Sequence, residues 1–303
     1  MRMSSCMLFN IMAIPDLSPH ALSSLLAIAE HGSVSAAARA RGLTQPSISR
    51  QIQELERQLG VHLVERTSQG ARLTPAGEAL ADGARDILSG LASLPERVKS
   101  RQGEVSGRVR VGTTDSIGIY VLPPVLASFV EANPRIDVQV VCQSSPQLMA
   151  MLLDDELDVA IGTTEHPKLT CERLYQNPLV LCHAKGMRES ELPNSVKELA
   201  EHRVVTFDKG LTIRNLIDQA FAKHGLTFKP VMSLSNVEVI KALVRSGIGL
   251  GIIPDGCVWN DEIITRPIAD LNVSRTVRLM YRPQNQAMAT ARMVEWMRKL
   301  RQP

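Results

Sequence analysis

The sequence predicts a helical N-terminal domain of the winged helix-turn-helix class, a long linker helix, and a C-terminal α/β domain. Three observations lead to this fold class. Apolar residues recur at helical spacing in short segments before residue 60. A heptad-like apolar repeat follows over residues 80–98. From Gly107 onwards, short apolar strands alternate with helical patterns, which is typical of parallel sheets covered by helices.

Length and composition agree with a globular protein of two or three domains. The chain has 303 residues, of which 44% are hydrophobic and 21% are charged. No segment approaches the roughly 20 apolar residues that span a bilayer, so we expect a cytoplasmic protein without membrane contact. The net charge of +3 is too small to indicate a polyanionic partner by itself.

The cysteines are odd in number and scattered, and none forms a C-x-x-C pair. This pattern argues against a disulfide framework and against a zinc site, so we expect reduced thiols and no metal or other cofactor. The five are Cys6, Cys142, Cys171, Cys182 and Cys257.

Residues 1–15 precede the patterned sequence. Their apolar run follows Arg2, as in a secretory signal, but no small-x-small cleavage site occurs before Asp16. Export is therefore not expected. Met3, Met7 and Met12 instead suggest a misplaced start codon or a disordered extension.

The first two predicted helices lie on either side of a glycine turn. One begins at Pro19 and ends at the turn His31-Gly32. The second covers residues 34–41 and begins after Ser33, a residue type that caps helices. Its three consecutive alanines, 36–38, allow another helix to cross closely.

The third predicted helix, residues 45–59, has one buried stripe and one polar side. Thr44 is placed to cap it, and Pro46 stands in its first turn, where a missing N–H costs nothing. At its N-terminal end, Gln45 and Arg50 are residue types that pair with adenine and guanine in the major groove. The buried stripe is Ile48, Ile52, Leu55 and Leu59.

A small hairpin, or wing, is predicted over residues 61–73, which completes a domain over residues 16–73. Arg66 and Arg72 would flank the third helix and favour phosphate or minor-groove contacts. Between Arg39 and Arg72, six arginines stand against three glutamates. The predicted DNA contacts are Ser33, Thr44, Gln45, Pro46, Ser47, Ser49, Arg50, Gln53, Arg66 and Arg72.

In order along the chain, these motifs resemble the signature of the LysR-type transcriptional regulator family. The matching runs are AIAEHGS (27–33), AAA (36–38), TQPSISRQI (44–52), LVERT (63–67) and LTPAG (73–77). The resemblance implies a bacterial, sequence-specific regulator that binds promoter DNA, and it also implies RNA polymerase as a partner.

A linker helix over residues 74–104 is predicted to pair two chains. Its apolar positions recur every three or four residues, which buries a seam against a partner helix, although packing against its own domain is the alternative. Pro95 predicts a kink or break. The resemblance extends the dimer to a homotetramer. The predicted dimer contacts are Leu80, Ala84, Ile87, Leu91, Leu94 and Val98.

The C-terminal domain, residues 105–303, resembles the LysR effector domain more diffusely. The matching runs are RVG (110–112), LPP (122–124), NP (133–134), ELDVAIG (156–162) and LVRSGIGLGIIP (243–254), while Gln143 and Asp155 stand where glycines are common. The resemblance implies two α/β lobes like those of a periplasmic binding protein, joined by two crossing strands. Lobe I would be residues 107–164 and 269–303, and lobe II residues 165–268.

Hydroxyl-rich and amide-rich turns follow several predicted strands of this domain. Ligands of open α/β sheets bind beyond the carboxyl ends of strands, where helix N-termini offer free N–H groups. A small polar or anionic effector is therefore expected between the lobes, although simple helix capping is an alternative explanation for each residue. The resemblance implies Ser116, Ser145 and Thr163, which align with positions that often touch effector in relatives, and Thr206 is the expected contribution from the middle of lobe II. The full set of predicted effector contacts is Thr114, Ser116, Ser144, Ser145, Thr163, Thr206 and Asn236.

Three rival functions are weaker. The run Gly247-Ile248-Gly249-Leu250-Gly251 lacks dinucleotide-binding spacing, and no nucleophile elbow, Walker loop or H-E-x-x-H pair occurs, so an enzyme is not expected. A purely structural DNA-binding protein would not need the long C-terminal domain. Peroxide sensors of the LysR-type family carry a reactive cysteine pair at the position that corresponds to residues 204–214, and this sequence has no cysteine there. Cys142, at the end of a predicted strand, is the remaining candidate for oxidation.

Overall fold

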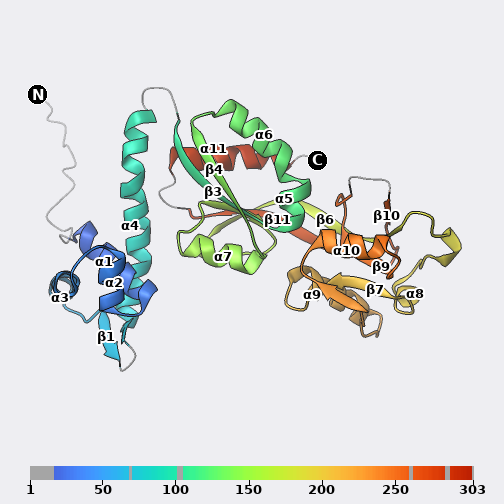
Figure 1. The fold of residues 1–303 in the computed structure, drawn as a ribbon, viewed down its shortest axis with the longest axis horizontal. Helices are drawn as coiled ribbons and strands as arrows, with labels where there is room; N and C mark the ends of the chain where they lie inside the picture. Colours follow the sequence, from blue (N-terminus) through green and yellow to red (C-terminus); the bar gives the residue numbers. More distant parts are fainter. Residues whose placement is uncertain (1–16, 68–69, 101–104, 259–261, 284–286, 302–303) are drawn as a thin grey trace, which may run out of the picture. The chain divides into compact units, whose positions relative to one another are not determined.

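The computed structural model describes residues 17–67, 70–100, 105–258, 262–283 and 287–301. The chain separates into two compact units, which divide between Ala92 and Ser93 and are described in turn (Figure 1). The extension predicted over residues 1–15 lies outside the described residues.

The first unit begins with three helices, as the sequence predicted. Helix α1 (Pro19–His31) ends at Gly32, whose φ of 66° is readily adopted by glycine. Helices α2 (Val34–Ala40) and α3 (Gln45–Leu59) follow. The apolar stripe of α3 packs into one core with α1, α2 and the start of α4, and the largest fully buried members are Leu22, Leu25, Ile28, Ile48, Leu55 and Leu63.

The predicted wing is present as an antiparallel pair, β1 (Val64–Thr67) and β2 (Gly70–Leu73). Glu56 of α3 fixes its base by accepting a hydrogen bond from the N–H of Leu63 over 2.8 Å. Gly70 lies so close to α1 that a Cβ there would stand 2.3 Å from the carbonyl oxygen of Gly32. The wing is therefore held against the helices.

Helix α4 (Pro75–Ser100) is capped by Thr74, whose hydroxyl accepts a hydrogen bond from the N–H of Gly77 over 3.0 Å. The helix is continuous through Pro95, so the predicted break does not occur. A proline removes only one backbone hydrogen bond, and neighbouring residues continue the helix.

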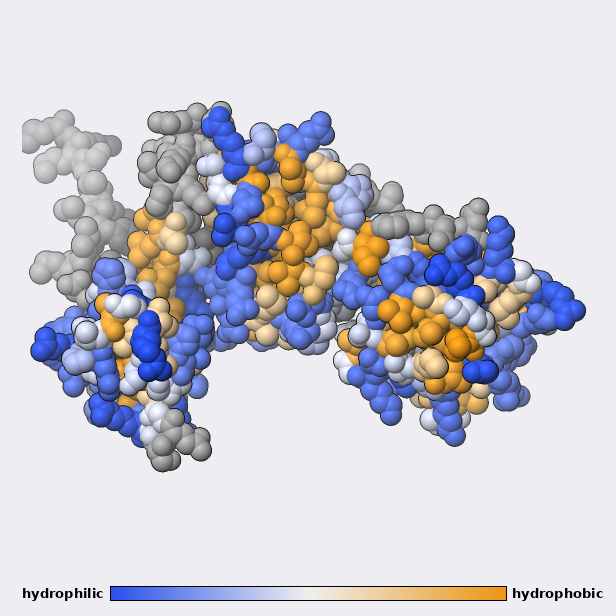
Figure 2. Space-filling view, in the orientation of Figure 1, coloured by the Kyte–Doolittle hydropathy of each residue, from blue (hydrophilic) through white to orange (hydrophobic). Residues whose placement is uncertain are grey.

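The predicted seam of α4 divides into two parts. Leu80 packs on the core of the first unit and Ala84 is buried in it, so the prediction that Ala84 contacts a partner is wrong. Further along the helix, Ile87, Leu91 and Leu94 are exposed, and Figure 2 shows apolar surface along α4. The side chain of Val98 lies outside the described residues.

The second unit contains one continuous sheet in the described part of the chain, in the order β4-β3-β5-β11-β6-β9-β7-β8, with β10 paired to β6. In lobe I, β3 (Gly107–Thr113) pairs in parallel with β4 (Ile136–Cys142) and β5 (Val159–Gly162). The helical segments of this lobe are α5 (Asp115–Tyr120), α6 (Leu122–Ala132), α7 (Ser145–Leu153), α11 (Met288–Met297) and η3 (Arg298–Arg301).

Two long antiparallel strands, β6 (Thr170–Ala184) and β11 (Ser274–Tyr281), connect the lobes. Each lobe has its own apolar core, on either side of these strands. This is the predicted two-lobed fold. The remaining elements, all in lobe II, are η2 (Glu189–Glu191), α8 (Val196–Leu199), β7 (Val204–Phe207), α9 (Thr212–Lys223), β8 (Met232–Leu234), α10 (Val237–Arg245), β9 (Leu250–Pro254) and β10 (Ile263–Arg266).

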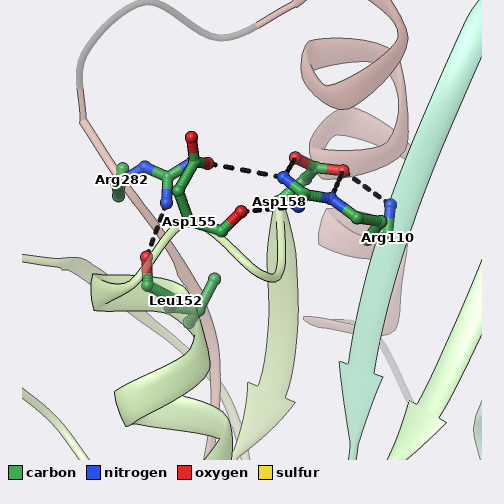
Figure 3. Close-up of polar contacts among 5 residues, drawn as sticks. All are labelled: Arg110, Leu152, Asp155, Asp158 and Arg282. Carbon is green, nitrogen blue, oxygen red and sulfur yellow. Dashed lines mark hydrogen bonds and ion pairs between the residues drawn. The ribbon is translucent and has the colours of Figure 1, made fainter. Parts of the chain in front are cut away.

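The departure from glycine at position 155 has a structural explanation. Asp155 has a φ of 61°, a left-handed conformation that Asp tolerates better than most residues. Its carboxylate pairs with both Arg110 and Arg282, and Arg110 also binds Asp158 over 2.8 Å (Figure 3). Asp155 thus joins β3 to the chain that follows β11.

Candidate functional site

The polar face of α3 in the first unit is the candidate nucleic-acid interface. Gln45, Pro46 and Arg50 are exposed, and Ser49 is half-buried. Thr44 caps the helix, because its hydroxyl accepts a hydrogen bond from the N–H of Ser47 over 3.3 Å. Capping of this kind fixes the start of the helix on which these side chains stand.

Other predicted DNA contacts have roles within the domain. The Ser33 hydroxyl caps α2 by accepting a hydrogen bond from the N–H of Ala36 over 3.1 Å. Arg72 forms an ion pair with Glu65 over 3.0 Å, so its charge is partly compensated. Arg50 and Arg66 are exposed and form no ion pair with any residue that the structure describes. These two arginines are the most available cations among the predicted contacts.

In the second unit, a cavity of about 350 Å³ lies between the lobes. Lobe I contributes the turns after β3, β4 and β5, and lobe II contributes the end of β7 and the starts of α9 and α10. A cavity of this size suits a small molecule. Five of the seven predicted effector contacts line it, namely Thr114, Ser116, Ser144, Ser145 and Thr163.

Two predicted contacts do not line the cavity. Thr206 is fully buried, and the neighbouring Phe207 faces the cavity instead. Successive residues of a strand point to opposite faces, so the prediction was wrong by one position. Asn236 lies behind the wall, where its amide group donates a hydrogen bond to Asp115 Oδ2 over 2.9 Å.

Some cavity residues combine capping or positioning with exposure to the cavity. The Ser145 hydroxyl accepts a hydrogen bond from the N–H of Thr163 over 3.0 Å, which ties α7 to the end of β5. The Ser144 hydroxyl and backbone N–H both bind the side chain of Gln147. The Thr114 hydroxyl oxygen, in contrast, is buried without a hydrogen-bond partner among the described residues.

Arg275, on the crossing strand β11, is a cavity residue that the sequence reasoning missed. It is only 8% exposed, and its guanidinium donates to Ser116 Oγ and to Asn177 Oδ1, each over 3.0 Å. Burial lowers the pKa of Arg275 from its usual value, because desolvation disfavours the charged form. The sequence did contain a signal for this residue. Arg275 alternates with Val277 and Leu279 along the strand, so a cation lies on a strand face that is otherwise apolar.

Cys142 also lines the cavity, at the end of β4, where it is exposed overall but partly desolvated. Burial and the nearby carboxylate of Asp115 raise the pKa of its thiol. The thiolate, which is the form that attacks peroxide, is therefore disfavoured. This environment does not favour a redox sensor.

Among the described residues, no group of three or more histidine, cysteine, aspartate or glutamate side chains is arranged to hold a metal ion. No helix in the same part of the chain combines the length and apolarity needed to cross a membrane.

Family models match both units. One described as "Bacterial regulatory helix-turn-helix protein, lysR family" matches residues 19–78, and one described as "LysR substrate binding domain" matches residues 102–302. Curated relatives include the HTH-type transcriptional regulator BbuR of Bordetella bronchiseptica, which is 30% identical over 277 residues, covering 88% of this chain and 84% of BbuR. A probable RuBisCO transcriptional regulator of Porphyra purpurea is 32% identical over 238 residues, covering 76% of this chain and 75% of that protein.

Solved structures share the fold. CbnR, a LysR family transcriptional regulator, has a TM-score of 0.59 at 24% identity, covering 94% of this chain and 100% of CbnR. A full-length OxyR variant from Pseudomonas aeruginosa has a TM-score of 0.67 at 21% identity, covering 93% of this chain and 98% of that one. CbnR has also been solved in complex with its target DNA.

Proposed function

Because this chain belongs to the LysR family of DNA-binding transcriptional regulators, we propose that a small molecule bound in the cavity of its second unit controls how it binds promoter DNA. One observation carries the proposal: the cavity lies between two lobes that the long strands β6 and β11 connect, and both lobes line it. A ligand there contacts both lobes at once.

Sequence is read, on this proposal, by the N-terminal end of α3. Gln45, Pro46, Ser49 and Arg50 contact base edges, and Arg66 contacts phosphate. The exposure of Arg50 and Arg66 without ion pairs supports these roles. The other predicted contacts, Ser33, Thr44, Ser47, Gln53 and Arg72, line the same interface or orient it.

We assign residues 16–73 to DNA binding, residues 74–104 to dimerisation and residues 105–303 to ligand binding. Ile87, Leu91 and Leu94 form the dimer seam, because three exposed apolar side chains on one helix face favour a partner. Two such domains engage half-sites about one DNA turn apart. Exposed apolar residues at both edge strands, Val140 of β4 and Met232 of β8, support a second pairing between effector domains and hence a homotetramer.

Control follows from differential binding. A ligand that prefers one arrangement of the lobes shifts the protein towards it by no more than its difference in affinity for the two arrangements. DNA bending or half-site spacing then changes in the assembled regulator, and with it the contact to RNA polymerase, in the cytoplasm where promoter DNA is found.

The test is calorimetric titration of the full-length protein with metabolites of the enzymes encoded beside its DNA sites. A compound that binds and alters the DNA footprint supports the proposal. Ser116→Ala and Ser145→Ala should weaken its binding, whereas Ser246→Ala, a change outside the cavity, should not. Normal binding to both cavity variants would show that the ligand site lies elsewhere.

A further inference from the structure

The charge of Arg275 is poorly compensated in the cavity wall. Its two protein partners, Ser116 and Asn177, are neutral, and no carboxylate among the described residues forms an ion pair with it. A buried cation without a counter-ion is costly, so buried arginines are usually paired. Arg275 is only 8% exposed, and it reaches solvent through the cavity that it lines.

The guanidinium also retains donors for a ligand. An arginine has five N–H donors in a planar fork. Asn177 accepts from Nε and Ser116 accepts from Nη1, which leaves Nη2 without a hydrogen-bond partner in the described part of the chain. Such a fork matches the two oxygens of a carboxylate, and its neutral partners hold it in place.

The cavity walls differ in polarity between the lobes. Lobe I contributes hydroxyl and amide side chains, including Thr114 and Gln143, and also the carboxylate of Asp115, which accepts a hydrogen bond from Asn236; Arg275 lines the cavity beside them. Lobe II contributes mainly apolar side chains, among them Phe207, Leu211 and Ile213, together with the hydroxyl groups of Thr212 and Ser235. A ligand that suits both walls is amphipathic, with an anionic end towards lobe I and an apolar body towards lobe II.

We propose that the cavity selects a small organic carboxylate, and that Arg275 is the residue that selects it, by pairing its guanidinium with the ligand carboxylate. The inference rests on the proposed function, since it names the ligand class of the same cavity. Arg275 stands on β11, which pairs with β5 of lobe I and with β6, so the carboxylate binds at the strands that join the lobes.

The experiment compares matched carboxylates and amides on the full-length protein. Benzoate, hexanoate and acetate are titrated beside benzamide, hexanamide and acetamide, at constant chloride, with calorimetry and thermal shift as readouts. The unmutated protein should bind benzoate and hexanoate at least about tenfold more tightly than their amides, because hydrogen bonds to charged groups are the stronger ones. Acetate, which lacks an apolar body, should bind more weakly than either.

The variants assign the selectivity to one side chain. Arg275→Met should reduce the carboxylate-to-amide ratio to near one, and Arg275→Lys should keep a smaller preference, since it retains the charge and loses the fork. Arg278→Gln, on the same strand and paired with Glu165 outside the cavity, should leave the ratio unchanged. Partial unfolding of a variant lowers its affinity for carboxylate and amide alike and leaves the ratio of the two unchanged. If the Arg275→Met protein does not fold at all, the ratio measured for Arg275→Lys decides.

In these titrations, three results would overturn the inference: equal binding of carboxylates and amides, an unchanged ratio in Arg275→Met or Arg275→Lys, or no binding of any carboxylate at millimolar concentration. An uncharged ligand that depends on Ser116 and Ser145 would overturn the carboxylate assignment and leave the proposed function intact. A ligand whose affinity is unchanged by both Ser116→Ala and Ser145→Ala would contradict the proposed site itself.

Discussion

Asn236 donates a hydrogen bond to Asp115 over 2.9 Å, and this contact joins α10 of lobe II to α5 of lobe I at the cavity wall. A second contact lies beside it: the Tyr120 hydroxyl of α5 binds the side chains of Glu238 and Lys241 of α10. We call these five residues the lobe latch. One of its members, Asp115, lines the cavity, so the latch lies beside the cavity.

Asn236→Ser should weaken the latch and spare the helix cap. Serine still offers an oxygen to the N–H of Glu238, which Asn236 Oδ1 accepts over 2.8 Å, but it has no amide group to reach Asp115. We expect a loss of about 1 kcal/mol in unfolding free energy and faster hydrogen exchange in α10. Asn133→Ser, which removes an amide contact within lobe I, is the control, and equal exchange in α10 of both variants would argue against the latch.

Arg50→Ala should relax DNA sequence preference, at a cost of about 1–3 kcal/mol on the preferred site. Arg66→Ala should instead weaken all sequences alike and reduce the salt slope by about one. Arg57→Ala is the matched control on the same helix, because Arg57 is bound to Glu54. Gel-shift titrations at several salt concentrations measure all three, and an Arg50 variant with unchanged preference would contradict the assignment.

Leu91→Asp should prevent dimerisation through α4, because a buried unpaired carboxylate is costly. Leu91 is exposed within one chain, so the monomer should keep its fold. Ala92→Asp places the same charge on an exposed residue about 100° round the helix and should leave the dimer intact. Sedimentation decides, and a monomeric unmutated protein would eliminate the model of two paired half-sites.

Cys142 should react slowly with peroxide and with iodoacetamide. A thiol whose pKa is raised stays protonated at neutral pH, and its reactivity increases only as the pH rises through that raised pKa. Mass spectrometry measures the alkylation rate of Cys142 at pH 7 and pH 9, and this rate is compared with that of free cysteine. Rapid modification at pH 7, together with loss of a peroxide response in Cys142→Ser, would restore the redox-sensor reading.

Two substitutions at position 155 distinguish the effect of backbone strain on stability from the effect of ion pairing. Asp155→Ala removes both ion pairs and leaves alanine in a left-handed conformation, whereas Asp155→Gly removes the pairs alone. The glycine variant should therefore be more stable than the alanine variant by about 1 kcal/mol in urea unfolding. The reverse order would show that position 155 does not impose this conformation in solution.

Periodicity and caps predicted the first unit well, because its signals are local. The turn at Gly32, the cap at Thr44 and the stripe beginning at Ile48 each lie within a few residues of the structure they determine. The seam of α4 was only partly predictable. The repeat that includes Ala84 and Leu91 does not reveal that the domain itself covers the first and not the second.

The turn residues that line the cavity were predicted from the sequence, whereas the strand residues that line it were missed. Ser116 and Ser145 follow strand ends, a position where ligands of open α/β sheets usually bind, and both line the cavity. Arg275 lies 159 residues after Ser116 in sequence, and their contact depends on how β11 crosses between the lobes. Thr206 and Phe207 show the same limit, because strand register decides which of two neighbours faces the cavity.

The central claim, a ligand-controlled regulator that reads DNA as a dimer, is tested most directly by selecting genomic DNA fragments with the full-length protein. The account predicts enriched fragments that share a dyad-symmetric site with half-sites about one helical turn apart, a site that the Arg50→Ala protein no longer enriches. Fragments without a shared site, or the same site enriched equally by the Arg50→Ala protein, would contradict it.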